Sequence, residues 1–309
     1  MTDKKKRPVA GKTSHQNDDS EGKKKRPGRG KSERSSGKKQ RSKRAQGTLK
    51  NPKTASQQPH AEELMRINKY IAHSGLCSRR DADELISDGK VKVNGTVVTE
   101  LGTKVKKSDK IIVNGQTLTL EPFVYILLNK NSGTITTTDD ERDRETVMDT
   151  IEDATGNRVY PVGRLDRKTM GLLLLTNDGD LAHRLMHPSY KVKKTYLVQP
   201  NRILTEEEMI KLREGVELED GFAKPESVSR DAFRADSILI SVYEGRNHLI
   251  RRMVDYIGAD VKKLKRIQYA GLQEKDLKVG RWRYLRKAEI NNLRKLVKLD
   301  TLDFNQPDT

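Results

Sequence analysis

The sequence predicts an α+β protein in which a small domain and a larger domain follow a basic N-terminal arm. Helix-like and strand-like segments are mixed along the chain without a regular strand–helix–strand repeat, which favours α+β over a doubly wound parallel sheet. The 309 residues are enough for two domains, and their basic charge is concentrated near the start. We place the arm at 1–63, the two domains at 64–121 and 122–300, and a C-terminal tail at 301–309.

The arm is set apart by its charge. Residues 1–60 hold 19 Lys+Arg and 5 Asp+Glu, so most of the chain's net charge of +18 lies there. They include no Trp, Phe or Tyr, and we expect disorder because they cannot bury enough apolar surface to offset the entropy of ordering. A basic segment of this kind suits a polyanion, with nucleic acid as the leading candidate. A solubilising tail without a dedicated partner is the alternative.

Cysteine content and hydropathy narrow the class of protein. Cys77 is the single cysteine, which excludes an internal disulfide and favours a reducing compartment. The longest apolar run, 123–128, is far too short to span a bilayer, and the N-terminus lacks the apolar segment of a secretory signal. We therefore expect a cytoplasmic protein that does not cross a membrane.

The small domain is predicted to contain two helices and two hairpins. Apolar residues at helical spacing in 67–71 predict the first helix, and Ser78 can cap a second one at 79–87. Asn-Gly pairs lie inside the β-rich segments 91–98 and 110–118. Asn-Gly between strand-like residues is typical of a two-residue hairpin turn.

The larger domain is predicted to be built around a buried strand. Residues 172–175 are all leucine and turn residues bound the run, which predicts a strand covered on both faces. Before it we expect strands at 124–128 and 133–137 and a short helix at 146–151. After it we expect, in order, a helix at 180–186, a strand at 194–198, a helix at 206–214 opened by a capping box, a strand at 237–243, a helix at 248–256, strands at 265–269 and 281–285, and a helix at 288–298.

A polar loop leads directly into the leucine run. It carries Asp166 between Arg164 and Arg167, with Gly163 before and Gly171 after them. A side chain on a loop that a buried strand holds in place is well positioned for function. The residues alone leave a surface ion pair as the alternative, since most exposed ion pairs contribute little.

The loop resembles a known catalytic motif. Gly163-Arg164-Leu165-Asp166, followed by Thr169, Gly171 and the leucine run, is similar to that of the pseudouridine synthases. The match is to the ribosomal small-subunit synthase A family, which includes the large-subunit synthases B, E and F, and it extends from about residue 65 to 299. The resemblance implies a mixed, mainly antiparallel β-sheet in the larger domain. It also implies that Asp166 is a nucleophile in the isomerisation of an RNA uridine, a reaction that uses no cofactor and no metal.

Two further motifs of the family supply the other catalytic candidates. Lys194-Thr195-Tyr196 matches the Lys-x-Tyr motif, which implies that Tyr196 stacks on the target base and can take its C5 proton. A core tyrosine is the alternative. The segment 244–253 resembles the third motif and implies that Arg251 pairs with the catalytic aspartate, with phosphate contact as the alternative. Family members usually have Pro where this chain has Asn131, which leaves that turn open.

The segment 65–121 resembles the S4 RNA-binding domain through the patterns 66–70, 78–80 and 91–95. Its exposed cations can contact phosphates without reading bases. We add the motif arginines to them, with Arg164 implied to fill the space that an extruded base leaves. The RNA-binding candidates are Lys69, Arg79, Arg80, Lys92, Arg164, Arg246 and Arg252.

These residues favour an RNA-modifying isomerase whose partner is ribosomal RNA or a pre-ribosomal particle. The large-subunit (23S) RNA is favoured because the S4-like domain with a basic arm resembles synthases B and F, and the small-subunit (16S) RNA is the close alternative. A non-catalytic S4-type RNA-binding protein is the rival class. We expect a monomer. We also expect no metal site, because His183 and His187 lack a third ligand in view. The identity of the target uridine stays open, and so does the choice between attack of Asp166 at C1′ and at C6.

Overall fold

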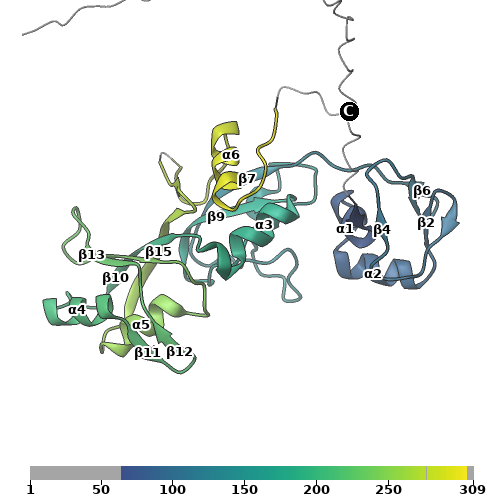
Figure 1. Cartoon of the computed structure of the whole chain (residues 1–309). Helices are drawn as coiled ribbons and strands as arrows, with labels where there is room; N and C mark the ends of the chain where they lie inside the picture. Colours follow the sequence, from purple (N-terminus) through teal and green to yellow (C-terminus); the bar gives the residue numbers. More distant parts are fainter. Residues whose placement is uncertain (1–63, 276, 305–309) are drawn as a thin grey trace, which may run out of the picture. The chain divides into compact units, whose positions relative to one another are not determined.

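The computed structural model describes residues 64–275 and 277–304 (Figure 1). The basic arm predicted at 1–63 and most of the predicted tail lie outside the described residues. Within the described ranges, no helix is long and apolar enough to cross a membrane.

The first part of the described chain contains the predicted pair of helices and pair of hairpins. Its elements are β1 (Met65–Arg66), α1 (Ile67–His73), α2 (Arg79–Ser87), β2 (Val91–Val93), β3 (Thr96–Val97), β4 (Lys104–Val105), β5 (Ile111–Val113) and β6 (Gln116–Thr117). Both Asn-Gly turns are confirmed, because Asn94, Gly95, Asn114 and Gly115 all have the positive φ that this turn requires. The four strands β3-β2-β5-β6 form one antiparallel sheet.

The second part begins at β7 and carries the remaining elements. They are β7 (Tyr125–Lys130), a 3₁₀ helix (Asp149–Ile151), β8 (Tyr160–Pro161), β9 (Met170–Thr176), α3 (Gly179–Met186), a second 3₁₀ helix (Pro188–Tyr190), β10 (Lys194–Pro200), α4 (Glu206–Glu214), β11 (Val216–Leu218), β12 (Gly221–Ala223), β13 (Ser227–Arg230), β14 (Ile238–Val242), α5 (Leu249–Tyr256), β15 (Val261–Tyr269), β16 (Leu272–Gln273), β17 (Trp282–Tyr284) and α6 (Lys287–Leu296).

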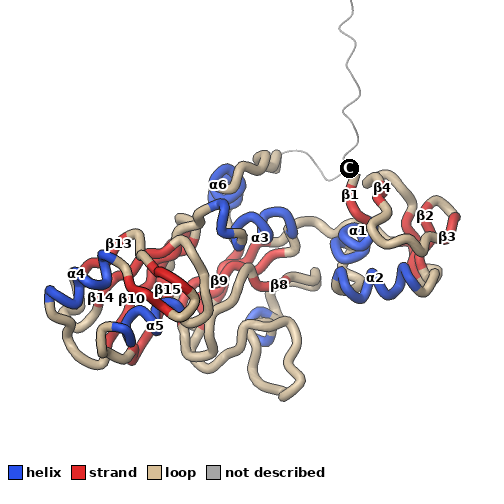
Figure 2. Tube along the Cα trace, turned by 60° about the horizontal axis from the view of Figure 1, so that its bottom comes forward, coloured by secondary structure: helices blue, strands red, loops and turns tan. Residues whose placement is uncertain are grey.

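Nine of these strands form one mixed sheet, in the order β13-β14-β10-β15-β9-β7-β17, with β16 beside β15 and β8 beside β9 (Figure 2). The pairing of β15 with β9 is parallel, and the other pairings in the sheet are antiparallel. The predicted α+β class and mainly antiparallel sheet are therefore confirmed. Both β8 and β15 pair with β9 but at opposite ends of it, and the loop 162–169 enters β9 at the end paired with β15.

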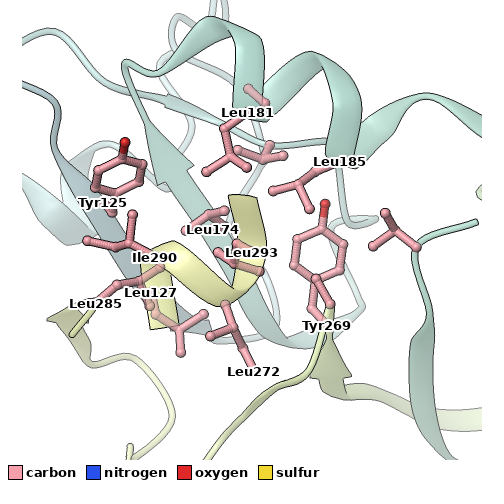
Figure 3. Packing of buried hydrophobic residues seen from close by; sticks show 14 of the residues in the cluster. Tyr125, Leu127, Leu174, Leu181, Leu185, Tyr269, Leu272, Leu285, Ile290 and Leu293 are labelled. Atoms are coloured by element: carbon pink, nitrogen blue, oxygen red, sulfur yellow. The ribbon is translucent and has the colours of Figure 1, made fainter. Parts of the chain in front are cut away.

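The leucine run of β9 is buried on both faces, as predicted. Leu172 and Leu174 pack with α3 and α6 (Figure 3), whereas Leu173 and Leu175 pack in a second cluster with Ile126. All four leucines are 0% exposed. Because successive side chains of a strand point to opposite faces, an uninterrupted apolar run needs cover on both sides.

The other half of the sheet is covered by helices on one face. Apolar side chains of α4 and α5 pack with residues of β10, β13, β14 and β15 in a third cluster. The capping box predicted for α4 is confirmed, because Thr205 accepts from the Glu208 N–H and Glu208 accepts from the Thr205 N–H.

One predicted element is wrong, and another is shorter than expected. Residues 133–137 form no strand, only a bridge between Ile135 and Thr146, because Gly133 and Thr136 bond to the Asp166 loop instead. The helix predicted at 146–151 is reduced to the 3₁₀ turn Asp149–Ile151. The hairpin of β11 and β12 was not predicted.

Candidate active site

Asp166 lies on a loop that hydrogen bonds hold from several sides. The ammonium of Lys130 donates to the carbonyl oxygens of Asp166 at 3.4 Å, Arg167 at 3.2 Å and Thr169 at 3.0 Å. Thr136 Oγ1 donates to the Leu165 carbonyl at 2.9 Å. The backbone of the loop is therefore fixed before any substrate binds, which reduces the cost of positioning the carboxylate.

Asn131 and Gly133 belong to the turn that bonds to the Asp166 loop. Asn131 Oδ1 accepts from Thr134 Oγ1 at 2.5 Å, so the residue that replaces the usual proline makes a polar bond within its turn. The N–H of Gly133 donates to the Arg167 carbonyl at 2.8 Å, and Arg167 Nε donates back to the Gly133 carbonyl at 2.8 Å.

Gly171 allows the close approach of β15 to this loop. A Cβ at this position would overlap the backbone of Arg266, and the φ of Gly171 is +105°. Gly171 and Arg266 are partners in the parallel pairing of β9 with β15. Glycine is therefore required at this position of β9, for both space and conformation.

The Asp166 carboxylate has three side-chain neighbours. Arg251 Nε lies 3.9 Å from Oδ2, His248 Nε2 lies 3.4 Å from Oδ1, and Thr169 Oγ1 donates to Oδ2 at 3.3 Å. The Asp166 side chain is 35% exposed, so one edge of the carboxylate is open to a substrate. The predicted pair of Asp166 and Arg251 is thus close in space.

Asp166 lies in a cleft of about 930 Å³ that the structure forms between the loop 162–169, β10 and the segment before α5. Tyr196, Arg164, Lys194 and His248 also line this cleft. Its volume is at the upper end of the range of ordinary ligand sites, about 300–1,000 Å³. Arg251 does not line the cleft, although its Nε lies 3.9 Å from Asp166 Oδ2.

His248 is a site residue that sequence reasoning did not select. It precedes α5 and has a φ of 50°, an uncommon conformation for a residue other than glycine. Strained backbone of this kind is found at functional sites when the surrounding structure holds it. Its place in the motif segment 244–253, three residues before Arg251, was the available signal.

Two lysines near the cleft have perturbed acid–base behaviour. Burial lowers the pKa of Lys130 to about 8, although the nearby Asp166 and Glu145 act in the opposite direction. Burial and the nearby Arg266 likewise lower the pKa of Lys194 to about 8. Lys194 Nζ donates to the carbonyl oxygens of Tyr243 at 2.8 Å and Val192 at 3.2 Å.

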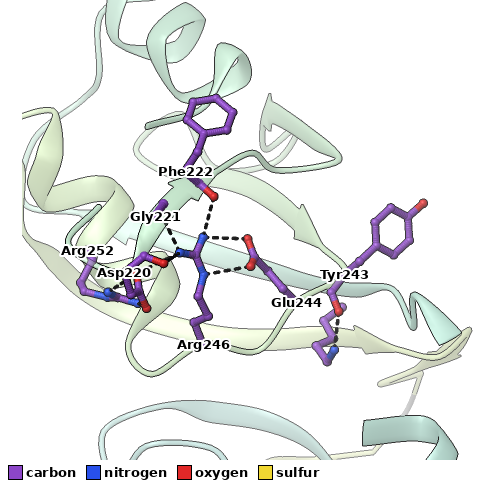
Figure 4. Close-up of polar contacts among 8 residues, drawn as sticks. Asp220, Gly221, Phe222, Tyr243, Glu244, Arg246 and Arg252 are labelled. Carbon is purple, nitrogen blue, oxygen red and sulfur yellow. Dashed lines mark hydrogen bonds and ion pairs between the residues drawn. The ribbon is translucent and has the colours of Figure 1, made fainter. Parts of the chain in front are cut away.

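Arg246 and Arg252, which sequence analysis assigns to RNA, are joined to the β11–β12 hairpin (Figure 4). Both donate to Asp220, Arg246 through Nη1 at 2.8 Å and Arg252 through Nη1 and Nη2 at 2.8 and 2.9 Å. Arg246 also forms ion pairs with Glu244 and donates to the Gly221 and Phe222 carbonyls. Arg246 therefore ties the segment before α5 to the hairpin, and Arg252 ties α5 itself to it. The contact of these arginines with phosphate stays a prediction.

The other cations predicted to contact RNA lie on α1, α2 and β2, and they differ in their surroundings. Lys69 Nζ donates to both carboxylate oxygens of Asp180, at 2.8 and 2.7 Å, and Arg79 Nη2 donates to Asn68 at 3.3 Å. Arg80 and Lys92 are exposed. Their contact with phosphates also stays a prediction.

The histidine pair considered for a metal lies on and just after α3. The rings of His183 and His187 are 5.5 Å apart between centroids. Among residues 64–275 and 277–304, no group of three or more His, Cys, Asp or Glu side chains is placed to hold a metal ion.

Two family models match the chain. The model described as RNA pseudouridylate synthase matches residues 124–256, and the S4 domain model matches residues 65–111. The first of these ranges contains the Asp166 loop, Tyr196 and Arg251. The boundaries of the two domains beyond the matched ranges stay a prediction.

Named relatives cover most of the chain. Ribosomal large subunit pseudouridine synthase B of Bacillus subtilis is 47% identical over 237 residues, which are 75% of this chain and 97% of that protein. An RNA pseudouridine synthase of Aquifex aeolicus, described as uncharacterized, is 41% identical over 239 residues, 76% of this chain and 96% of that protein. A crystal structure of a pseudouridylate synthase is similar with a TM-score of 0.54 and 28% identity, covering 74% of this chain and 99% of that one.

Proposed function

The chain belongs to the RNA pseudouridylate synthase family, and on that premise we propose that it converts a uridine of ribosomal RNA to pseudouridine, with Asp166 as the nucleophile. The observation that carries the proposal is that Asp166 and Tyr196 line one cleft, with Arg251 Nε 3.9 Å from the Asp166 carboxylate. Family membership supports the enzyme class, an isomerase. The roles of the individual residues are inferred from their geometry.

Asp166 has the chemistry that the first step needs. A carboxylate can attack either C1′ of the ribose or C6 of the base, forming a covalent intermediate. The bond between C1′ and N1 breaks, the base turns, C1′ bonds to C5, and the bond to the Asp166 oxygen breaks, which restores the free carboxylate. The C5 proton leaves and N1 gains a proton, so the reaction balances as an isomerisation. The open edge of the Asp166 carboxylate supports attack on a base or sugar that enters the cleft.

Arg251 acts through Asp166. It does not line the cleft, but its Nε lies 3.9 Å from Asp166 Oδ2, so it orients the carboxylate. This makes Arg251 a positioning residue. His248 lines the cleft, with Nε2 3.4 Å from the other carboxylate oxygen, Oδ1, and can help to orient the carboxylate.

Tyr196 is placed to act on the base. It lines the cleft, and its ring can stack on the uracil while the hydroxyl accepts the C5 proton. The target nucleotide must first leave its stack to reach Asp166. Arg164 is exposed at the edge of the same cleft and is suited to fill the vacated space.

The names of the relatives support a large-subunit substrate. The Bacillus subtilis protein carries the large ribosomal subunit in its name, so 23S RNA is the favoured target for this chain. The basic arm, the S4-like segment and a cytoplasmic location fit an enzyme that acts on ribosomal RNA or a pre-ribosomal particle. We further propose that it acts as a monomer.

A tritium-release assay tests the proposal. Wild-type protein incubated with ribosomal RNA labelled at uridine C5 is expected to release tritium, and Asp166→Asn is expected to release none while its RNA affinity changes less than about tenfold. Binding without release by the wild type would instead support a non-catalytic S4-type protein. Pseudouridine mapping in a strain that lacks the protein then identifies the uridine, and a missing site in 16S RNA would overturn the large-subunit assignment.

A further inference from the structure

An aromatic side chain stands in solvent on the turn between β13 and β14. Phe233 is 96% exposed, and the next most exposed large hydrophobic residue among those described, Ile203, is 61% exposed. A single exposed apolar side chain is ordinary by itself. Phe233 is distinguished by its neighbours, since Arg234 follows it directly and lines a cavity.

Hydrogen bonds order the backbone of the turn that carries Phe233. The N–H of Phe233 donates to Asp231 Oδ1 at 2.9 Å, and the N–H of Asp231 donates to the Ser237 carbonyl at 3.0 Å. The N–H of Ser237 donates to the Arg234 carbonyl at 3.0 Å. A side chain presented by an ordered turn loses little entropy on binding, which favours affinity.

The cavity beside Arg234 has a volume of about 330 Å³ and a basic lining. Lys263 and Lys265 of β15 line it together with Arg234, while Asp236 is the acidic residue of the lining. Asp236 is already engaged, because it accepts from Gln199 Nε2 at 2.6 Å and from Ser237 Oγ at 3.0 Å. Lys265 pairs with Glu274 at 2.5 Å, and Arg234 and Lys263 are exposed.

This cavity and the active-site cleft open on opposite faces of two strands. On β10, Tyr196 lines the cleft, and Leu197 and Gln199 line the cavity. On β15, Leu264 lines the cleft and Lys263 lines the cavity. Because side chains alternate along a strand, a ligand in the cavity does not contact the groups around Asp166.

We propose that Phe233, Arg234 and Lys263, which we call the hairpin patch, bind an unpaired segment of RNA outside the active site. Phe233 stacks on a base, and Arg234 and Lys263 contact the adjoining phosphates in the cavity. The combination of an exposed aromatic ring with cations is how proteins bind single strands without reading sequence. The positive lining favours a polyanion over an apolar protein surface. This inference rests on the proposed function only in taking RNA as the ligand.

The test measures RNA binding directly, with the full chain and a fluorescently labelled single-stranded oligouridylate. Phe233→Ala is expected to weaken binding about 5-fold or more, and Phe233→Tyr to restore it, because both rings can stack. Lys263→Ala is expected to reduce the slope of log affinity against log salt by about 0.7. Tyr256→Ala, an exposed aromatic on α5, which covers the opposite face, is the matched control and is expected to bind as the wild type.

The outcomes separate this inference from the proposed function. Single-turnover isomerisation at saturating RNA is expected to be unchanged in Phe233→Ala, since the hairpin patch lies away from the cleft. Equal oligouridylate affinity in Phe233→Ala and wild type would overturn the inference even if tritium is released normally. An unchanged affinity for naked RNA with weaker binding to ribosomal subunits would assign the patch to a ribosomal protein and overturn it too. A wild-type protein that binds RNA without releasing tritium would remove the proposed function alone.

Discussion

Arg251 and Asp166 face one another across 3.9 Å, from Nε of a residue on α5 to Oδ2 of a residue on the loop before β9. Arg251 is further held by a bond from its Nη1 to the Val261 carbonyl at 3.3 Å. The Arg251 side chain is 24% exposed and the Asp166 side chain 35%, so solvent screens the pair only in part. Arg251 is therefore placed to orient the Asp166 carboxylate.

Replacing Arg251 with Met is expected to lower the single-turnover rate about 10- to 100-fold, because a half-buried Asp166 loses its counter-ion. This corresponds to about 1–3 kcal/mol, less than the loss of a fully buried pair. Arg251→Lys, which keeps the charge, is expected to recover part of the rate. Rapid-quench kinetics at saturating RNA provide the measurement, and equal rates for the wild type and Arg251→Met would remove the pair from the mechanism.

Tyr196→Phe is expected to bind RNA normally and to stop after the first bond cleavage. The phenyl ring can still stack on the base, but the C5 proton has no hydroxyl to receive it. A covalent or abandoned intermediate should then accumulate, visible as slow-migrating RNA on a denaturing gel. Leu197→Ala, on the opposite face of β10, is the control for disturbance of the strand. Full tritium release by Tyr196→Phe would show that another group takes the proton.

Lys130 is expected to make the stability depend on pH. Its pKa is lowered to about 8 in the folded protein, chiefly by burial, whereas a lysine in an unfolded chain titrates near 10.4. Between these values the unfolded state binds more protons than the folded state, so the free energy of unfolding rises with pH. The difference in unfolding free energy between wild type and Lys130→Met should therefore grow from pH 8 to pH 10, by at most about 3 kcal/mol.

Urea unfolding of both proteins at several pH values measures this difference. The exposed Lys92→Met is the control, and its difference from the wild type is expected to stay constant with pH over the same range. A Lys130→Met difference that is flat with pH would mean that the four carbonyl acceptors stabilise the ammonium enough to offset burial, so that its pKa stays ordinary.

Asp220→Asn is expected to slow the reaction without weakening RNA binding. The amide cannot form the ion pairs with Arg246 and Arg252, so the attachment of the segment that carries His248 to the β11–β12 hairpin is weakened and rests on the bonds from Arg246 to the Gly221 and Phe222 carbonyls. We expect a 3- to 10-fold fall in the single-turnover rate, about 1 kcal/mol. Asp220→Glu should recover part of it, and Asp255→Asn on α5 should have no effect. Unchanged chemistry with weaker RNA binding would assign the two arginines to phosphate contact instead.

Local sequence determined most of the elements of this fold. The four leucines predicted a strand covered on both faces, Asn-Gly pairs predicted both hairpin turns, and Thr205 with Glu208 predicted the start of α4. These signals are strong because each depends on residues a few positions apart, whose conformational preferences act before any tertiary contact forms. The motif around Asp166 was recognisable for the same reason, since its residues are contiguous.

The strand predicted at 133–137 shows where local preference fails. The residues are β-branched in part, but Thr136 and Gly133 bond to the loop that carries Asp166. A segment is a strand only if a neighbouring strand pairs with it, and here the neighbour is a loop. Tertiary contacts therefore overrode the intrinsic preference.

Tertiary structure alone decided which side chains meet at the site. Tyr196 pairs with Arg266 and Thr195 with Gln268, so Ile267 is an extra residue in β15. This bulge brings Tyr269 to the cleft that Leu264 also lines, although five positions would otherwise place the two on opposite faces. The turn of His248 toward Asp166 likewise depends on an uncommon backbone conformation.

The sequence by itself thus determined the two-part α+β organisation, the buried strand and the identity of the candidate nucleophile. The structure decided that Lys130 fixes the Asp166 loop, that Arg251 lies beside the Asp166 carboxylate, and that Arg246 and Arg252 bond to Asp220. The physical reason is the separation along the chain between the residues that interact. Propensities and turns act over a few residues, whereas the partner of a charged side chain is set by strand register and loop closure between distant parts of the chain.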